Sequence, residues 1–255
     1  MKILMVNKFL HLNGGSETYV FSLGDYLKSQ GHEVEYFGMD HEKRVVSNRA
    51  NVYMSQLDFH AQGFKKLVYP FKIIYSVEAR RKIRQVLESF EPQVVHLNNF
   101  NFQLTPSIIY EIRAYGRKRH HPLTMIYTAH DYQLVCPNHM MKIPSSNKNC
   151  DACLSGNYAH CVKNRCIHNS LVKSFLGAFE GFLYRKLNTY SLIDAVICPS
   201  SFMETQLQAY PDLRNKTTPL HNFIMEIDKT PEEKEPYVLY FGRYSEEKGI
   251  KTLLE

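Results

Sequence analysis

The sequence predicts an α/β fold: a parallel sheet with helices on both faces and a cysteine-rich insertion. Short apolar runs alternate with helical patterns along most of the 255 residues, which is typical of βαβ units. Glycines mark the turns of the first strand–helix–strand unit. Five of the six cysteines fall between residues 136 and 166, where this alternation breaks.

The first βαβ unit is predicted over residues 2–37. Residues 2–7 form an apolar run typical of a buried strand, and residues 33–37 alternate as a second strand. Between them, Val20, Leu23 and Leu27 share one helix face, and Gly31 stands where a helix commonly ends.

The middle of the chain continues the alternation. Residues 41–62 are weakly patterned, with one strand expected near 52–54. A helix is predicted over 76–90, ended by Glu91-Pro92, since the residue before a proline disfavours the helical conformation. The elements expected after it are strand 93–97, helix 106–118 and strand 123–128.

The last part of the chain divides into an insertion, a return of the α/β pattern and a second domain. The insertion spans 136–168, and a long helix (169–189), a strand (195–198) and a short helix follow it. An acidic linker is expected over 226–236, then a strand at 237–241 and a helix beginning at the final LLE. We therefore expect one domain over 1–225 and the truncated start of another over 237–255.

Composition and charge exclude some classes of protein. There is no run of 18 apolar residues, which excludes a spanning helix, and the N-terminus lacks the features of a signal peptide. We expect a soluble intracellular protein. The net charge is +6, and residues 64–84 hold seven Lys or Arg and one Glu. That segment indicates either an anionic partner or a solvated helix face.

Two loops are candidate binding sites. Gly14-Gly15 follows the first strand and opens a helix, where free N–H groups and the helix dipole favour an anion; the alternative is a tight turn that needs positive φ. His130 and Asp131 follow the strand at 123–128, and His96 lies on the preceding one. Open α/β sheets bind ligands at these ends, although a loop histidine with a backbone partner is equally compatible.

The cysteines predict a structural zinc site. Cys150 and Cys153 have the spacing of two ligands on one tetrahedral zinc, and Cys161 and Cys166 would complete the set, with Cys136 as an alternate. Spare donors are His139, His160 and His168. Disulfide or redox use and free thiols are the alternatives.

Arg243 and Lys248 follow the strand predicted at 237–241. A guanidinium and an ammonium beside a helix N-terminus suit a diphosphate, and the alternative is an ordinary basic surface.

The order of these motifs resembles the family-4 glycosyltransferases of the GT-B fold. The resemblance is carried by GGSE at 14–17, GHEV at 31–34, EPQVVH at 91–96, TAHDY at 128–132 leading into Cys136-Pro137, CPS at 198–200, HNF at 221–223, and FGR at 241–243 with Lys248-Gly249. A subset of that family is similar in carrying a cysteine cluster after the His-Asp strand.

The resemblance implies a retaining enzyme with two Rossmann-like domains and no catalytic metal. The chain would supply the N-terminal, acceptor-binding domain. Gly14 and Gly15 would approach the donor phosphates and His130 would be catalytic, touching the transferred sugar. Two further sets complete the implied site: Arg243 and Lys248 at the leaving diphosphate, and Glu17, His96 and Asp131 at sugar or acceptor. The family's Glu-x7-Glu motif, which would hold the donor sugar and ribose, is expected beyond residue 255.

The resemblance also implies the partners. These are a nucleotide-diphosphate sugar, a lipid-linked or other saccharide acceptor, and an anionic membrane surface met by residues 64–84; no nucleic acid is expected. The membrane contact would use Lys65, Lys66, Lys72, Arg80 and Arg81 with Val68, Tyr69, Phe71, Ile73 and Ile74. The location would be cytoplasmic, with or without peripheral contact at the inner face of the plasma membrane. A catalytically inactive acceptor- or membrane-binding module is the alternative function.

Overall fold

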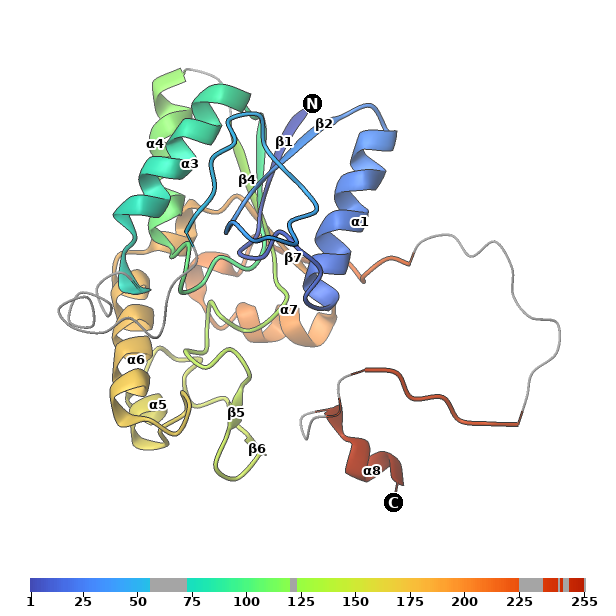
Figure 1. Ribbon diagram of the computed structural model, residues 1–255. Coiled ribbons are helices and arrows are strands. Elements are labelled where there is room, and N and C mark those ends of the chain that lie inside the picture. Colours follow the sequence, from blue (N-terminus) through green and yellow to red (C-terminus); the bar gives the residue numbers. More distant parts are fainter. Residues whose placement is uncertain (56–72, 120–122, 225–235, 243, 245–247, 255) are drawn as a thin grey trace. The chain divides into compact units, whose positions relative to one another are not determined.

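A computed structural model describes residues 1–55, 73–119, 123–224, 236–242, 244 and 248–254. The chain forms two compact units, Met1–Phe223 and Ile224–Glu255. The first unit contains the sheet and its helices (Figure 1).

The sheet of the first unit has six strands, all parallel. They are β1 (Lys2–Val6), β2 (Glu33–Phe37), β3 (Val94–Leu97), β4 (Thr124–Thr128), β7 (Ala195–Cys198) and β8 (Thr217–Pro219), in the order β2-β1-β3-β4-β7-β8. The predicted α/β fold is confirmed, and five of these strands were expected from the sequence.

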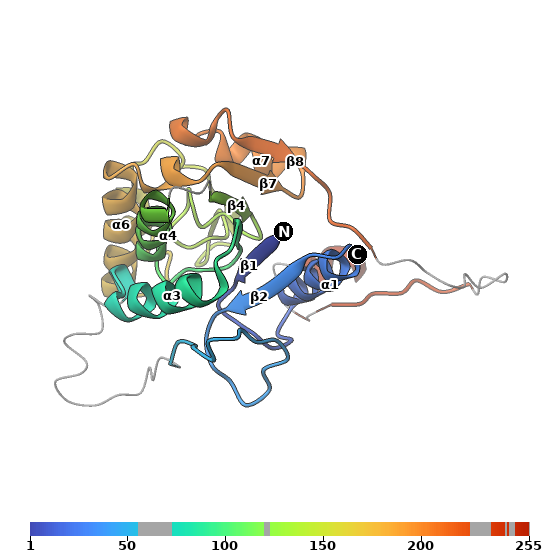
Figure 2. The same cartoon turned by 90° about the horizontal axis from the view of Figure 1, so that it is seen from above.

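Both faces of the sheet are buried, which explains why its central strands read as continuous apolar runs. On β1, Leu4 and Val6 join a core cluster with Ile83 and Ile108 of the helices on one side. Ile3 joins a second cluster on the other side, with residues of the first helix. Figure 2 shows helices α3 and α4 on one side of the sheet and α1 on the other.

The helices begin and end close to the predicted positions. They are α1 (Gly15–Ser29), α3 (Val77–Phe90), α4 (Ser107–Arg119), α6 (Leu171–Lys186) and α7 (Ser201–Leu207). Ser76, Ser170 and Ser200 cap α3, α6 and α7 by accepting a backbone N–H with the side-chain oxygen. Helix α3 ends at Glu91, which adopts a left-handed conformation before Pro92.

The insertion is small and irregular. It contains a two-stranded antiparallel hairpin, β5 (Lys142–Ile143) and β6 (Lys148–Asn149), and a short helix, α5 (Ala159–Lys163). Its buried core joins Cys153, Cys161 and Cys166 to Tyr158 and to Ala178 of α6. All six cysteines are free thiols.

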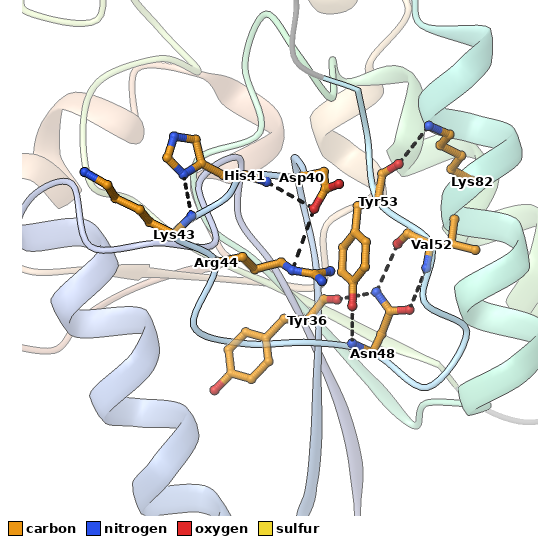
Figure 3. A network of polar contacts seen from close by, with 9 residues as sticks. All are labelled: Tyr36, Asp40, His41, Lys43, Arg44, Asn48, Val52, Tyr53 and Lys82. Carbon is orange, nitrogen blue, oxygen red and sulfur yellow. Dashed lines mark hydrogen bonds and ion pairs between the residues drawn. The ribbon is translucent and has the colours of Figure 1, made fainter.

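The weakly patterned segment after β2 is organised by Asn48 (Figure 3). The buried amide of Asn48 donates to the carbonyls of Tyr36 (2.9 Å) and Val52 (3.0 Å) and accepts from the N–H of Val52 (3.2 Å). The strand expected near 52–54 is reduced to a single parallel bridge between Met39 and Met54. Within residues 52–54, Met54 bonds to the backbone just after β2, whereas the backbone of Val52 bonds to the side chain of Asn48. The prediction of a strand was therefore wrong.

The described end of the basic segment is occupied by internal contacts. Arg80 and Arg84 both pair with Glu111 of α4, at 2.6 and 2.5 Å, and Ile74 is buried. The expectation that Arg80 and Ile74 meet a membrane was therefore wrong, whereas Arg81 is exposed. Residues 56–72, including Lys65, Lys66 and Lys72, lie outside the described residues.

The second unit differs from the prediction. Residues 237–241 form no strand, and Tyr237, Val238 and Phe241 are exposed, because the described part of the unit offers them no neighbouring strand. The helix α8 (Ile250–Leu254) begins three residues before the predicted LLE. Most of the expected linker lies outside the described residues.

Across the parts of the chain that the structure describes, every helix is too short or too polar to cross a bilayer.

Candidate functional site

The candidate site lies where three neighbouring parallel strands end. Asn7 and Lys8 follow β1, Asn98 and Asn99 follow β3, and His130 follows β4. Parallel strands present their carboxyl ends at one edge of the sheet, which is where open α/β sheets bind ligands. The six-stranded order therefore brings together residues that are more than 120 positions apart in the chain.

Asn7 fixes the N-terminal turn of α1 to this edge. Its amide donates to Glu17 Oε1 (3.0 Å) and to the carbonyl of Phe9 (2.8 Å), and its Oδ1 accepts the N–H of Asn99 (3.1 Å). Glu17 also accepts from Ser16 Oγ (3.0 Å). The carboxylate is 2% exposed. Glu17 therefore anchors the first turn of the helix to the end of β1.

Gly14 and Gly15, at the start of α1, do not adopt the left-handed backbone conformation. Gly14 is extended, with φ of 179°, and neither glycine is among those with positive φ. A Cβ on Gly15 would meet nothing within 4 Å, and one on Gly14 would make only ordinary contact with Glu17. The alternative interpretation, a tight turn that needs positive φ, was therefore wrong. Gly14 and Gly15 are exposed, and the first N–H groups of a helix have no intrahelical partner, so this turn is suited to an anion.

His130 is a neutral imidazole with an assigned tautomer. Asn98 donates its amide to the carbonyl of His96 (3.3 Å), so its Oδ1 accepts from Nε2 of His130 (2.9 Å). Burial lowers the pKa of His130 to about 4, and the nearby charge of Asp131 offsets this only in part. At neutral pH, Nε2 therefore carries the proton and Nδ1 carries a lone pair.

Aromatic rings stand beside this imidazole. Tyr19 of α1 meets His130 edge to face, with ring centroids 5.1 Å apart. Phe223 packs on the same tyrosine at 5.3 Å, so the HNF motif returns to the end of α1. His221 is held to the carbonyl of Pro199 by its Nδ1 (3.1 Å).

A polar chain runs from Lys8 to Asp131. Lys8 Nζ donates to Asn101 Oδ1 (3.2 Å), Asn101 contacts Nδ1 of His139 (2.7 Å), and that nitrogen lies 3.5 Å from Asp131. Burial opposes the charge of Asp131, but the hydrogen bond and charge of His139 outweigh it and lower the pKa of this carboxyl. Burial also lowers the pKa of Lys8, against the charges of Asp131 and Glu17.

Two of the predicted contact residues are enclosed by protein. His96 is 5% exposed and its Nε2 bonds to Thr128 Oγ1 (2.7 Å), while burial, then the neighbouring His130, lowers its pKa to about 4. Glu17 is equally buried. The expectation that Glu17 and His96 contact a sugar or acceptor directly is therefore corrected. Glu17 instead supports Asn7, and His96 supports Thr128. Asp131 remains partly exposed.

The remaining predicted residues fall elsewhere. Arg243 lies outside the described residues, and Lys248 is exposed in the second unit, which is described by itself. Sequence reasoning missed Asn7, Lys8, Asn98 and Asn101, and it considered His139 only as a spare zinc donor. The signal for these four was the polar run directly after each buried strand, NK after β1 and NNFN after β3.

No group of three or more His, Cys, Asp or Glu side chains in the described ranges already has the arrangement of a metal site. The cysteines of the insertion nevertheless line one small cavity.

Comparisons with known proteins bear on this site. A family model described as Glycosyltransferase Family 4 matches residues 13–225. A search of curated proteins gave no match.

Several solved structures resemble the chain at low identity. The apo form of the lipopolysaccharide outer core galactosyltransferase WaaB has 12% identity and a TM-score of 0.45, over 92% of this chain and 50% of that chain. Anabaena HepE in complex with UDP and glucose has 12% identity and a TM-score of 0.43, over 88% and 45%. The catalytic domain of Starch Synthase IV from Arabidopsis thaliana, bound to ADP and acarbose, has 12% identity and a TM-score of 0.43, over 87% and 51%. The chain spans about half the length of these structures.

Proposed function

The chain belongs to glycosyltransferase family 4, and from this premise we propose that it is the acceptor-side part of a retaining enzyme. The enzyme would move a sugar from a nucleotide-diphosphate sugar to a saccharide or lipid-linked acceptor. The observation that carries the proposal is the meeting of the Gly14-Gly15 turn with His130 at one edge of the sheet, inside the region that matches the family.

The glycine turn supports binding of the donor phosphates. The backbone of Gly14 and Gly15 needs no glycine for its own conformation, and the space beside Gly15 is open. A side chain here would obstruct only something that approaches from outside the chain. The N-terminus of a 15-residue helix offers N–H groups and a favourable dipole to such an anion.

His130 would contact the transferred sugar through Nδ1. Because Asn98 accepts the proton of Nε2, the lone pair of Nδ1 can accept a hydrogen bond from a sugar hydroxyl. Burial keeps the ring uncharged at neutral pH. A neutral histidine avoids an ion pair with the donor diphosphate that would bind the ground state as strongly as the transition state.

The departing diphosphate needs positive charge. Lys8 lies between Asp131 and Glu17, whose charges compensate its own. We assign the stabilisation of the leaving group to Arg243 and Lys248, which would act as fixed cations in place of a catalytic metal. Asp131, held by His139 and the N–H of Gln133, would accept a hydrogen bond from sugar or acceptor.

A screen of nucleotide sugars with the complete gene product tests the activity. One donor should be turned over by the unmodified enzyme. His130→Ala should then lower kcat by about 100-fold or more while donor affinity changes little, since the contact gains strength as the glycosidic bond breaks.

The control is His32→Ala, which makes the same change just before β2, at the opposite edge of the sheet, and should leave kcat unchanged. Equal losses of kcat and donor affinity in His130→Ala would contradict the proposed role. If no nucleotide sugar is turned over or bound, the function itself is wrong and an inactive acceptor-binding module takes its place.

A further inference from the structure

The insertion brings five thiols around one cavity. Cys136, Cys150, Cys153, Cys161 and Cys166 all line a cavity of about 10 Å³, together with His160 and Asp151. This is the space of about one water-sized sphere. Five cysteines from the stretch 136–166 thus line a volume that one ion would fill.

Backbone turns bring the thiols there. Cys136 closes a turn after β4 with its N–H on the carbonyl of Tyr132 (2.9 Å), and Cys150 leaves hairpin β5–β6 with its N–H on the carbonyl of Met141 (2.8 Å). Cys153 ends the Cys-x2-Cys turn and accepts Gly156 N–H with its carbonyl (2.9 Å). Cys166 returns to the cavity through a bond to the carbonyl of Cys161 (3.0 Å).

Cys136 is a buried lining residue of the cavity. It is 9% exposed, and its thiol donates to Asn138 Oδ1 (2.9 Å), a bond that a bound metal ion would replace. Cys150, Cys153 and Cys166 line the same cavity, so the side chains of all four cysteines face one small volume.

Cys161 belongs to the buried core of the insertion and is not part of the proposed ligand set. It is 1% exposed and packs with Tyr158 and Ala178, and its sulfur lies 4.0 Å from the carbonyl of Ser174 in α6.

We propose that Cys136, Cys150, Cys153 and Cys166 hold one structural zinc ion, with Cys161 packed in the core behind them. This set replaces the one expected from the sequence, which included Cys161 and kept Cys136 as an alternate. Four thiolates at about 2.3 Å would form a closed tetrahedral site. The four sulfurs have to close in on the cavity, and four protons leave as the metal binds.

The zinc would also order part of the candidate site. His139 donates its N–H to the carbonyl of Cys136 (2.9 Å) and accepts the N–H of Tyr132 (3.1 Å), and its ring contacts Asp131 and Asn101. A metal bound to Cys136 would therefore fix the residue that holds Asp131. The metal proposal itself stands independently of the proposed reaction.

Metal content of the chain tests the proposal. Protein purified without chelator should hold about one zinc per chain. Cys136→Ser and Cys153→Ser should each lower the zinc content at least tenfold, and Cys161→Ser and Cys198→Ser should retain it. Retention in Cys136→Ser with loss in Cys161→Ser would restore the set expected from the sequence and overturn ours.

A cobalt titration of the unmodified chain covers variants that fail to fold. One equivalent of Co²⁺ should give thiolate-to-metal charge-transfer absorption and the strong visible bands of a tetrahedral site, and Zn²⁺ should remove both. Chelator should release the metal and lower the midpoint of thermal unfolding. Disulfides among these cysteines in freshly purified protein, or no uptake of either metal by the reduced chain, would overturn the proposal.

Discussion

Two buried histidines, His96 and His130, make the stability of this protein depend on pH. Burial lowers the pKa of both to about 4. The ordinary value for an unfolded chain is about 6.5, so below that pH the unfolded state binds more protons than the folded state. Stability is therefore complete above about pH 6.5 and falls as the pH decreases towards 4.

We predict that His96→Gln reduces this acid sensitivity. At pH 5 the unmodified chain should be less stable than at pH 7.5 by on the order of 1 to 2 kcal/mol for each buried histidine. Denaturant unfolding at the two pH values measures the difference. His221→Gln, which changes an exposed ring, should leave it unchanged. An equal pH difference in His96→Gln and the unmodified chain would show that His96 titrates normally.

At the scale of elements, the segment from 41 to 55 depends on one side chain. Asn48 makes three hydrogen bonds with its buried amide and a fourth through its N–H to Tyr53 Oη (3.1 Å), as seen in Figure 3. Lys82 of α3 then donates to the carbonyl of Tyr53 (2.7 Å). These bonds tie an irregular segment to β2 and to a helix.

We predict that Asn48→Ala destabilises the protein by about 2 to 3 kcal/mol, because the carbonyls of Tyr36 and Val52 lose their donor. Thermal or denaturant unfolding gives the value. Asn215→Ala removes the same amide from an exposed turn and should cost less than about 0.5 kcal/mol. Equal effects of the two variants would mean that the segment is held by other contacts.

Elements were predictable where the local pattern was strong. Helix α3 has a buried face of Ile83, Val86, Leu87 and Phe90, and β2 has the predicted limits. The three-residue strand β8 has two exposed residues and therefore carries no periodic signal. Strand β8 forms because its backbone pairs in parallel with β7.

At the scale of the molecule, the first unit contains its own sheet and core. All six strands and both large core clusters lie within residues 1–223. In the second unit, the apolar side chains of Tyr237, Val238 and Phe241 are exposed. The division into a domain over 1–225 and a separate start of another stays a prediction that the stability of fragments can test.

We predict that a fragment of residues 1–224 unfolds cooperatively with a midpoint within about 3 °C of that of the whole chain, which corresponds to less than about 1 kcal/mol. Circular dichroism during heating measures this. A fragment of residues 1–208 lacks β8 and the buried Leu213, and should unfold at a much lower temperature. A large loss in the 1–224 fragment would show that the later residues contribute to the fold.

The sequence by itself determined the α/β class, the limits of most helices and strands, and the motifs of the family. These follow from short-range periodicity, glycine positions and residue order, which are local properties. Only the tertiary structure placed Asn7, Asn98 and His130 at one sheet edge, because the order of strands in a sheet cannot be predicted from the local sequence pattern. It also decided which residues are enclosed. His96 and Glu17 are buried and bond to Thr128 and Asn7, and the thiol of Cys161 packs against α6. Burial depends on what the rest of the chain packs over a residue, and that is known only once the chain has folded.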